Sequence, residues 1–279
     1  MSGLYKIRQA YSSFTTTEKK IAEYIEKNRE KVIESSSQDL AKITGTSASA
    51  WVRFAKKLGY KGITALKVEL AKEKDDNGDM FNVVISENDS IETMIKKVNS
   101  ISIATIDQTY KLLNSKTLKD AISCILNSKN IFLVGVGGSG IICNDFMQKL
   151  TRINRNVIYH EDSHVLMARV AHIKKEDVII AVSYSGETET INNIVSYAKI
   201  VGTPVIAITQ YNVKSTLAKL SDLTFYTPVE EKELRLGSIS SRNAAFVITD
   251  LLYYGVAKNN TKQTKEDLIA TRKIIHPND

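Results

Sequence analysis

Two turns rich in glycine and hydroxyl residues each follow a short apolar run, and their residue types suit the binding of an anion. The first turn spans residues 135–140 after Ile131–Val134, and the second spans residues 183–188 after Val178–Val182. Each apolar run has the length and β-branched composition of a buried strand. Each turn is therefore expected at the carboxyl end of a strand, where the following helix presents unpaired N–H groups. Such groups attract anions, above all phosphate.

Hydroxyl side chains in these turns indicate which anion. The second turn carries Ser183, Ser185 and Thr188, and the first carries Ser139. Hydroxyl groups donate well to the oxygens of a terminal phosphate. In open parallel sheets, ligands bind in the crevice outside the carboxyl ends of the strands, so both turns can converge on one pocket. The pattern favours a small phosphorylated ligand.

The glycines of the first turn also fit a dinucleotide site. Gly135, Gly137 and Gly140 satisfy the Gly-x-Gly-x-x-Gly pattern of dinucleotide-binding folds, with Glu161 and Asp162 about twenty residues further on. The second, hydroxyl-rich turn has no necessary place in such a site. A Walker A loop is excluded because no Gly-Lys-Ser/Thr follows the glycines. Taken alone, either turn is better explained by helix capping and tight turns, and only the pair favours a binding site.

The elements around these turns alternate between strand-like and helix-like patterns. Later strands are expected near residues 157–159, 205–208 and 223–226, with helical patterns between them. This alternation predicts a doubly wound parallel sheet. Helical spacing after Ser90, and again over residues 118–125, predicts two helices that pack on the sheet or pair across a dimer.

The first 60 residues contain three helix start signals. A capping-box pattern begins at Thr15, a signal at Ser36 precedes a helix that stops at Gly45, and Ser47 caps a helix that runs to Leu58. The last helix has its apolar residues on one stripe: Trp51, Phe54, Ala55 and Leu58. Two short helices separated by a glycine turn are typical of a helix-turn-helix, whose second helix lies in the major groove of DNA.

The basic charge of the chain is concentrated in the same region. Of the net charge of +7, residues 1–77 hold 15 basic and 10 acidic residues. Charge alone favours nothing more than a solvated surface. Off the apolar stripe, however, the last helix carries Arg53, which is suited to reading a base edge, and lysines suited to phosphates. The predicted DNA contacts are Ser47, Ser49, Arg53, Lys56, Lys57 and Lys61. A small helical bundle also has glycine turns and one basic face, so this pattern alone leaves the function undecided.

Composition sets the class of protein and its organisation. The 279 residues are 43% hydrophobic and 25% charged, as in soluble globular proteins. The polar run at residues 74–79 predicts a boundary, giving a helix-turn-helix domain (1–77), a linker (78–89) and a sheet domain (90–279). No long apolar stretch or secretory signal is seen, so we expect a cytoplasmic protein without a membrane partner. Cys124 and Cys143 are too few for a zinc site and are expected to be buried free thiols; no metal or cofactor is expected.

Together, these motifs resemble those of the RpiR-type bacterial transcription regulators, which join a helix-turn-helix to a phosphosugar-binding sugar isomerase (SIS) domain. The resemblance rests on residues 14–22, residues 52–62, both turns, and residues 233–242. It implies an α/β fold class, with an all-α N-terminal domain before a doubly wound, SIS-like sheet domain. The phosphosugar contacts that it implies are Gly137, Gly138, Ser139, Ser183, Tyr184, Ser185, Gly186 and Thr188. The chain departs from the family at Ala50, often threonine or serine there, and at Trp51, commonly a smaller β-branched residue.

The function that the resemblance implies is a DNA-binding transcriptional regulator of carbohydrate metabolism that senses a phosphorylated sugar. Its expected partners are double-stranded operator DNA, a phosphosugar effector and further copies of itself in a homodimer or homotetramer. The alternative is an SIS-type isomerase, for which Glu187, Glu231 and His164 are the candidate acids and bases. Because a DNA-binding region would have no use on an isomerase, we expect no enzyme. The polar segment 230–242 either contacts the sugar or a partner subunit, or consists of exposed charges leading to Ser241 as a helix cap; we slightly favour the latter.

Overall fold

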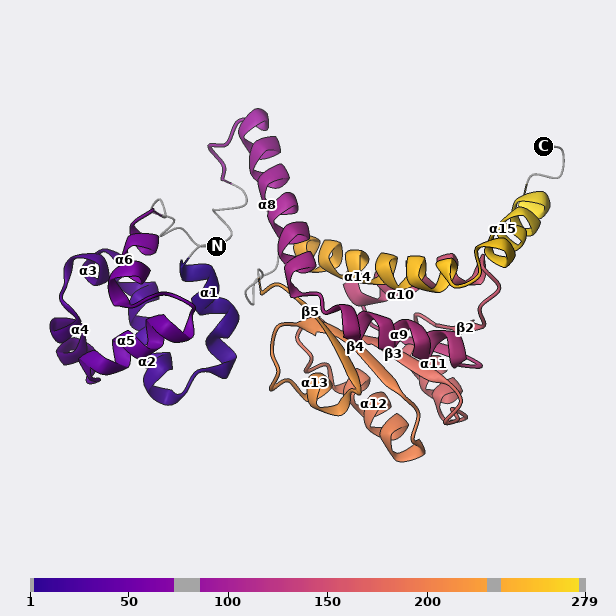
Figure 1. Ribbon diagram of the computed structural model, residues 1–279. Coiled ribbons are helices and arrows are strands. Elements are labelled where there is room, and N and C mark those ends of the chain that lie inside the picture. The colour runs from indigo at the N-terminus through magenta and orange to yellow at the C-terminus, as the bar shows by residue number, and fades with distance from the viewer. Residues whose placement is uncertain (1–2, 73–85, 230–236, 276–279) are drawn as a thin grey trace. The chain divides into compact units, whose positions relative to one another are not determined.

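The computed structural model describes residues 3–72, 86–229 and 237–275, which form two compact units (Figure 1). The helical unit comprises Met1–Asp89 and the sheet unit comprises Ser90–Asp279. Most of the predicted linker, at residues 78–85, lies outside the described residues, so the boundaries at residues 77 and 89 stay a prediction. The two units are described separately below.

The helical unit is built from short helices whose start signals are used as the sequence predicts. Its elements are α1 (Gly3–Ala10), the 3₁₀ helix η1 (Tyr11–Ser13), α2 (Thr16–Lys27), α3 (Arg29–Glu34), α4 (Ser37–Thr44), α5 (Ala48–Lys57) and α6 (Ile63–Lys72). Thr15 caps α2 in a complete capping box with Glu18. Ser36 caps α4 and Ser47 caps α5 through their side-chain oxygens. The predicted helix-turn-helix is therefore the pair α4 and α5.

The apolar stripe of α5 forms the centre of the helical unit. Trp51 and Phe54 are fully buried there, and the indole of Trp51 packs edge-on against Tyr24 with ring centroids 6.4 Å apart. The indole N–H donates to the hydroxyl of Thr44 at 3.3 Å, so the polar end of the large side chain is satisfied. Gly45 has a left-handed φ of 60° that turns the chain from α4 into α5. Trp51 thus fits as a core residue that links the two helices.

The sheet unit has five parallel strands in the order β2-β1-β3-β4-β5. The strands are β1 (Ile131–Val134), β2 (Val157–Ile158), β3 (Val178–Val182), β4 (Val205–Gln210) and β5 (Leu223–Thr227). The chain crosses from the edge strand β2 past β1 to β3, so the direction of winding reverses between β1 and β3. The carboxyl ends of strands at such a reversal form a natural ligand crevice.

Helices cover both faces of this sheet, as a doubly wound fold requires. Helices α9 (Ser115–Asn127), α10 (Gly138–Thr151) and α14 (Ile239–Lys258) pack on one face. Helices α11 (Ser163–Val170), α12 (Glu189–Val201) and α13 (Thr216–Leu220) pack on the other. Neighbouring residues of one strand supply opposite cores, because Leu133 joins the first core and Phe132 joins the second. The long helix α8 (Ile91–Leu112) lies against α14, and α15 (Thr261–Ile275) follows α14.

Some expectations need adjustment at the level of single residues. Cys143 is buried beneath the turn after β1, but Cys124 on α9 is only partly buried, so the expectation of two buried thiols is wrong for Cys124. Among the described residues, no helix is both long and apolar enough to cross a membrane. Within the same residues, no cluster of histidine, cysteine or acidic side chains is arranged to hold a metal ion.

Candidate functional site

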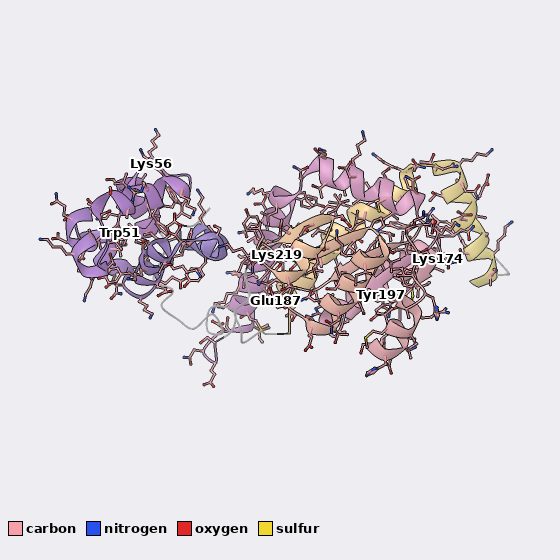
Figure 2. All side chains as sticks on the ribbon, turned by 90° about the horizontal axis from the view of Figure 1, so that it is seen from below. Trp51, Lys56, Lys174, Glu187, Tyr197 and Lys219 are labelled. Carbon is pink, nitrogen blue, oxygen red and sulfur yellow. The ribbon has the colours of Figure 1, made fainter. Side chains whose placement is uncertain are left out.

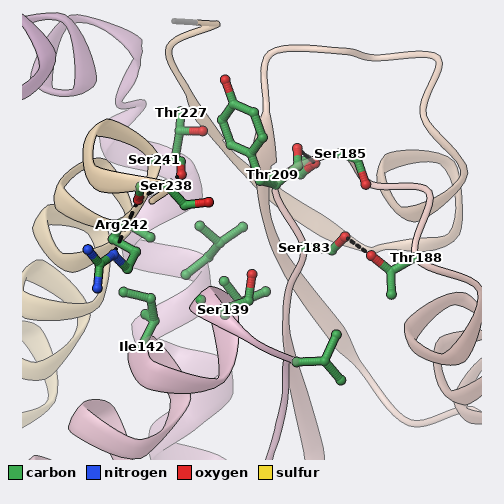
Figure 3. A pocket seen from close by; sticks show the side chains of 16 residues that line it. Ser139, Ile142, Ser183, Ser185, Thr188, Thr209, Thr227, Ser238, Ser241 and Arg242 are labelled. Carbon is green, nitrogen blue, oxygen red and sulfur yellow. Dashed lines mark hydrogen bonds between the residues drawn. The ribbon is translucent and has the colours of Figure 1, made fainter. Parts of the chain in front are cut away.

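Both predicted turns line one small cavity at the carboxyl ends of β1 and β3 (Figure 3). The cavity has a volume of about 130 Å³ and takes Ser139 from the first turn and Ser183, Ser185 and Thr188 from the second. Pockets for drug-sized ligands usually have volumes of about 300–1,000 Å³. The space therefore suits a small ligand rather than an extended dinucleotide.

The glycines of the first turn have local structural roles. A Cβ on Gly135 would lie 2.8 Å from the sulfur of Cys143, and one on Gly140 would lie 2.6 Å from the hydroxyl oxygen of Tyr159. Gly137 has a φ of 56°, which L-residues with side chains rarely adopt. The pattern is thus explained by the close contacts of Gly135 with Cys143 on α10 and of Gly140 with Tyr159 after β2, and by the backbone conformation of Gly137.

The second turn is fixed by hydrogen bonds to the neighbouring strand. The carbonyl oxygen of Tyr184 accepts from the backbone of Gln210 at 2.9 Å and from the hydroxyl of Thr209 at 3.2 Å. The carbonyl oxygen of Gly186 accepts from the amide of Asn192 at 3.2 Å. Across the turn, the hydroxyl oxygens of Ser183 and Thr188 lie 2.9 Å apart. The hydroxyl groups are therefore held in place before any ligand arrives.

Helix starts at the cavity differ from the remaining helix starts of the sheet unit. Helices α8, α9, α11 and α13 each begin with a side chain that accepts from the first-turn N–H groups. Helices α10, α12 and α14 begin at Gly137, Thr188 and Ser238 without a side-chain cap. These three are the helices whose N-cap or first-turn residues line the cavity. Uncapped N–H groups and the positive ends of three helix dipoles favour an anion at this place.

A third wall of the cavity comes from the start of α14, and here the expectation of a capping Ser241 is wrong. Ser238 occupies the N-cap position, and Ser241 lies within the first turn of α14. Positive φ angles of 69° at Gly237 and 53° at Ser238 turn the chain early, so the helix starts at Ile239. Ser238, Ser241 and Arg242 line the cavity instead of forming a simple exposed lead-in. The rest of the polar segment, residues 230–236, lies outside the described residues.

Arg242 is the one charged side chain among the described residues that line the cavity. Its Nε donates to the carbonyl oxygen of Ser238 at 3.2 Å, which holds the guanidinium beside the first turn of α14. The side chain lies across the cavity from the Ser183–Thr188 hydroxyl pair (Figure 3). The described part of the cavity therefore combines neutral hydroxyls with one positive charge, which suits a polyhydroxylated anion.

The acidic and imidazole candidates for isomerase chemistry lie elsewhere. The carboxylate of Glu187 accepts from the backbone N–H and the hydroxyl of Thr216, at 2.9 and 2.7 Å. Asp162, an acidic residue of the dinucleotide pattern, instead caps α11, and hydrogen bonds from the backbone N–H groups of His164 and Val165 lower the pKa of its carboxyl. His164 is exposed on α11, and Glu231 lies outside the described residues. Neither Glu187 nor His164 is among the residues that line the cavity.

The structure thus brings together most of the predicted ligand contacts and adds others. Gly138, Ser139, Ser183, Tyr184, Ser185 and Thr188 line the cavity, whereas Gly137 and Gly186 shape the turns without lining it. The sequence reasoning did not name Thr209 and Thr227, near the carboxyl ends of β4 and β5. It left open whether the segment with Ser238, Ser241 and Arg242 contacts the sugar, and all five residues line the cavity. Thr209 and Thr227 follow apolar runs, the same signal that marked the first two turns.

The predicted DNA contacts lie on the outer side of α5 and just beyond it. Arg53, Lys56, Lys57 and Lys61 are exposed, and Figure 2 shows Lys56 extending outward while Trp51 lies inside the unit. Four of these side chains have intramolecular partners: Ser47, Ser49, Arg53 and Lys57. The hydroxyl of Ser47 accepts from Ala50 N–H at 3.1 Å, and the ammonium of Lys57 lies 2.7 Å from the carboxylate of Glu18. Arg53 contacts only the Ser49 hydroxyl among these residues, at 3.3 Å.

Both units match known protein families. Residues 1–77 match the model of the rpiR-family helix-turn-helix domain, and residues 124–254 match that of the SIS domain. An uncharacterised HTH-type transcriptional regulator from Caldanaerobacter subterraneus is 32% identical over 269 residues, which cover 96% of this chain and 95% of that protein. The resemblance therefore extends over both units of one relative.

Solved structures share the architecture. The NanR protein of Vibrio vulnificus, complexed with ManNAc-6P, is 25% identical, with a TM-score of 0.62 and coverage of 99% of this chain and 98% of its own. The sugar isomerase domain of an RpiR transcription factor from Sphaerobacter thermophilus covers 64% of this chain and 98% of its own, with 17% identity and a TM-score of 0.57. A putative sugar-phosphate isomerase from Listeria monocytogenes covers 68% of this chain and all of its own, with 20% identity and a TM-score of 0.58. The last two likenesses establish the fold of the sheet unit.

Proposed function

The chain belongs to the rpiR family of helix-turn-helix transcription regulators with an SIS domain, and from this premise we propose that it binds operator DNA under the control of a sugar phosphate. The proposed effector binds in the cavity between the turns after β1 and β3. Ser139, Ser183, Ser185 and Thr188 receive the phosphate, and the wall at Ser238, Ser241 and Arg242 faces the sugar.

One observation carries the proposal: the three helices that begin at the cavity lack side-chain caps, whereas α8, α9, α11 and α13 have them. First-turn N–H groups that no capping side chain occupies can donate to a bound anion. A phosphate carries enough acceptor oxygens for these groups and is stabilised by the helix dipoles. The likeness to NanR, which is complexed with ManNAc-6P, supports a phosphorylated sugar as this ligand.

We propose that the chain senses its sugar without converting it. Sugar-phosphate isomerisation needs a general acid and base within hydrogen-bond reach of the reacting carbon. Glu187 is engaged with Thr216, and the cavity walls formed by the described residues carry hydroxyls and Arg242 but no carboxylate or imidazole. This arrangement supports binding rather than proton transfer, and it fits a protein that acts on DNA.

Control of DNA binding requires that the sugar phosphate bind one state of the protein better than another. The ratio of the sugar phosphate's affinities for the two states sets how far it shifts their populations. By thermodynamic linkage, if the sugar phosphate changes the affinity for DNA by a given factor, DNA changes the affinity for the sugar phosphate by that same factor. Helix-turn-helix proteins commonly act as dimers on half-sites about one helical turn of DNA apart, or a multiple of it. We therefore propose a homodimer or a homotetramer as the active form.

A thermal-shift panel of sugar phosphates on the full chain tests the sensor. We expect at least one sugar phosphate to raise the melting temperature of the sheet unit at millimolar concentration, whereas the same sugar without phosphate does not. The double variant Ser183→Ala/Ser185→Ala should fold but lose this stabilisation, because two hydroxyl donors to the phosphate are gone. Stabilisation of the double variant equal to that of the wild type would reject the phosphate site.

Three further measurements separate the regulator from its alternatives. Filter binding or fluorescence anisotropy with DNA from upstream of the gene that encodes this chain should show specific binding. The sugar phosphate that stabilises the protein should change the affinity of that binding. Turnover of a sugar phosphate by the purified chain, without DNA affinity at moderate salt, would support an isomerase instead. Stabilisation by NAD in place of sugar phosphates would support the dinucleotide-binding alternative.

A further inference from the structure

A groove separate from the sugar cavity lies between the end of α14 and helix α15. Its volume is about 860 Å³, and volumes of about 300–1,000 Å³ are usual for sites that bind a ligand. Figure 1 shows α15 turning out of the line of α14, so the two helices meet at an angle. The α14–α15 groove, as it is called here, is lined by residues of these helices between Tyr254 and Arg272 and by Arg152 at the end of α10. None of its described lining residues lines the sugar cavity.

Contacts along α15 hold the walls of the groove in place. The hydroxyl of Thr264 donates to the carbonyl oxygen of Ala257 on α14 at 2.8 Å. Further along α15, the hydroxyl oxygen of Thr271 lies 3.5 Å from the carbonyl oxygen of Arg152. Between these two positions, Leu268 packs against the core on one face of the sheet. The groove is therefore shaped before any partner arrives, which lowers the cost of ordering its walls on binding.

The floor of the groove is apolar and part of it is exposed. Ala257 and Leu268 lie deepest, packed against the core of the sheet, whereas Tyr254 and Ile269 are 68 and 43% exposed. The lining residues of α15 are spaced three or four apart, so they share one face of the helix. This face runs from residue 261 to residue 272, which is about 16 Å or three turns of helix. An apolar floor of this length is typical of a surface that binds a partner.

The rim of the groove is positively charged. Among the described residues that line it, four carry a positive charge and none carries a carboxylate: Arg152, Lys258, Lys265 and Arg272. Within the described parts of the chain, Arg152, Lys258 and Lys265 have no ion-pair partner. Cations at the ends of α10 and α14 also offset the helix dipoles, but Lys265 lies in the middle of α15, where that effect is absent. Like charges around one apolar floor favour an acidic partner.

We propose that the α14–α15 groove docks an acidic, amphipathic helical segment of another protein. The apolar face of such a segment covers Tyr254, Leu268 and Ile269, and its carboxylates pair with Lys258 and Lys265 at the rim. About three turns of helix match the length of the groove. A nucleic-acid backbone or a free phosphate brings negative charge but no apolar face, so neither makes use of the floor. Because the groove is separate from the sugar cavity, the docking site is independent of the proposed effector.

Fluorescence anisotropy of the full chain with a labelled model peptide tests this site. The probe has about 16 residues, with leucine on one helical face and glutamate on the other, so that it is long enough to form a helix. We expect it to bind with a dissociation constant in the micromolar range. A scrambled peptide of the same composition should bind at least about tenfold more weakly, because it keeps the charge but loses the continuous apolar face. Equal affinities of the two peptides, or no binding of either, would overturn the proposal.

Charge reversal locates the peptide on the chain. Lys258→Glu/Lys265→Glu should weaken binding of the leucine–glutamate peptide at least about tenfold, because two attractive charges become repulsive. The matched control is Lys262→Glu/Lys273→Glu, which makes the same change of charge at exposed lysines of α15 that do not line the groove. Its affinity should stay within about twofold of the wild type. Equal losses in the two variants would overturn the proposal, since attraction to the net charge of the chain would then explain binding.

A second pair of variants tests the apolar floor. Ile269→Ser should weaken the peptide about fivefold, because it removes an apolar contact of the floor. Ile274→Ser changes a side chain of the same helix that is 83% exposed and does not line the groove, so it should leave the affinity unchanged. All four variants should keep the helical circular dichroism of the wild type. A lower mass of Lys258→Glu/Lys265→Glu than of the wild type in sedimentation equilibrium would overturn the proposal and assign the groove to a second copy of this chain.

Discussion

The two units begin their helices with the same residue types but use them in opposite ways. In the helical unit, the side-chain oxygens of Thr15, Ser36 and Ser47 accept hydrogen bonds from first-turn N–H groups of α2, α4 and α5. At the cavity of the sheet unit, Thr188 and Ser238 stand at helix starts without capping them. A serine or threonine before a helix is therefore ambiguous as a sequence signal. The hydroxyl of Thr188 pairs with that of Ser183 and not with the first-turn N–H groups, so a serine or threonine at a helix start does not by itself identify a cap.

Glycines at turns show the same contrast between the units. Gly45 in the helical unit and Gly186 in the sheet unit both have left-handed backbones, with φ of 60 and 70°. A Cβ on Gly45 would meet nothing within 4 Å, whereas one on Gly186 would lie 2.7 Å from the Cβ of Ser215. The turn between α4 and α5 needs glycine for its backbone alone, while the turn at the cavity also needs it for packing.

The largest predicted effect comes from exchanging these two glycines for alanine. Gly186→Ala should lower the free energy of unfolding of the sheet unit by about 2–4 kcal/mol, since left-handed strain and overpacking add. Gly45→Ala should cost only about 1 kcal/mol, from backbone strain alone. Chemical denaturation of each variant, followed by circular dichroism, measures both. Equal costs at the two positions would contradict the claim that the cavity turn is rigidly packed.

A second prediction concerns the exposed cations of α5. Arg53→Ala should weaken specific operator binding by about 1–3 kcal/mol if the guanidinium reads a base edge. Lys57→Ala should cost less, because its ammonium already pairs with Glu18 at 2.7 Å and would have to leave that carboxylate. Fluorescence anisotropy at two salt concentrations, with operator and with scrambled DNA, separates specific from non-specific loss. If Arg53→Ala weakens both DNAs equally, Arg53 contacts phosphate and not a base.

Local signals in the sequence predicted much of the fold. Start signals such as Thr15 and Ser47 work over three or four residues, so they identify α2 and α5 without any knowledge of tertiary packing. Buried strands are recognised equally well, because β1 and β3 are continuous apolar runs with every residue buried. The two turns then follow from the strands, since parallel strands end on the same edge of a sheet.

The third wall of the cavity was harder to predict for a physical reason. Ser238 and Arg242 reach the cavity only because α14 returns across the sheet to lie beside α10, a contact between residues about 100 positions apart. Nothing within a few residues of Arg242 distinguishes a pocket-lining arginine from an exposed one. The early start of α14 depends on a left-handed Ser238, a conformation that non-glycine residues seldom adopt. Sequence patterns therefore found the parts fixed by local geometry and left undecided the part fixed by helix packing.

A third prediction exchanges one hydroxyl in each unit. Ser47→Ala should lower the stability of the helical unit by about 1 kcal/mol, because the cap of α5 is lost. The single tryptophan of the chain, the buried Trp51, reports this unfolding by fluorescence without interference from the sheet unit. Ser139→Ala should change the stability of the sheet unit by less than about 0.5 kcal/mol, since alanine suits a helix, yet weaken the sugar phosphate about tenfold. Loss of stability without loss of ligand affinity in Ser139→Ala would make that serine structural.

The smallest effect comes from the ion pair that ties α5 to the start of α2. Burial raises the pKa of Glu18, but hydrogen bonds from Lys57 and from Thr15 outweigh it, so the pKa of the folded carboxyl lies below its ordinary value. A lowered pKa contributes stability above the unfolded value of about 4.3 that is lost as the pH falls through the folded value. The stability of the helical unit should therefore fall between about pH 5 and pH 3 by up to about 1 kcal/mol because of Glu18.

Glu18→Gln isolates this charge, because glutamine can still complete the capping box with Thr15. Above about pH 5 the variant should be less stable than the wild type, and the difference should shrink towards zero as Glu18 becomes protonated. Denaturation followed by Trp51 fluorescence at several pH values measures that difference in stability. Protonation of the other carboxylates affects both proteins alike and therefore cancels in the comparison. A difference that stays constant down to about pH 3 would mean that Glu18 stabilises the helical unit through shape and hydrogen bonding, and that Lys57 is free to bind DNA at little cost.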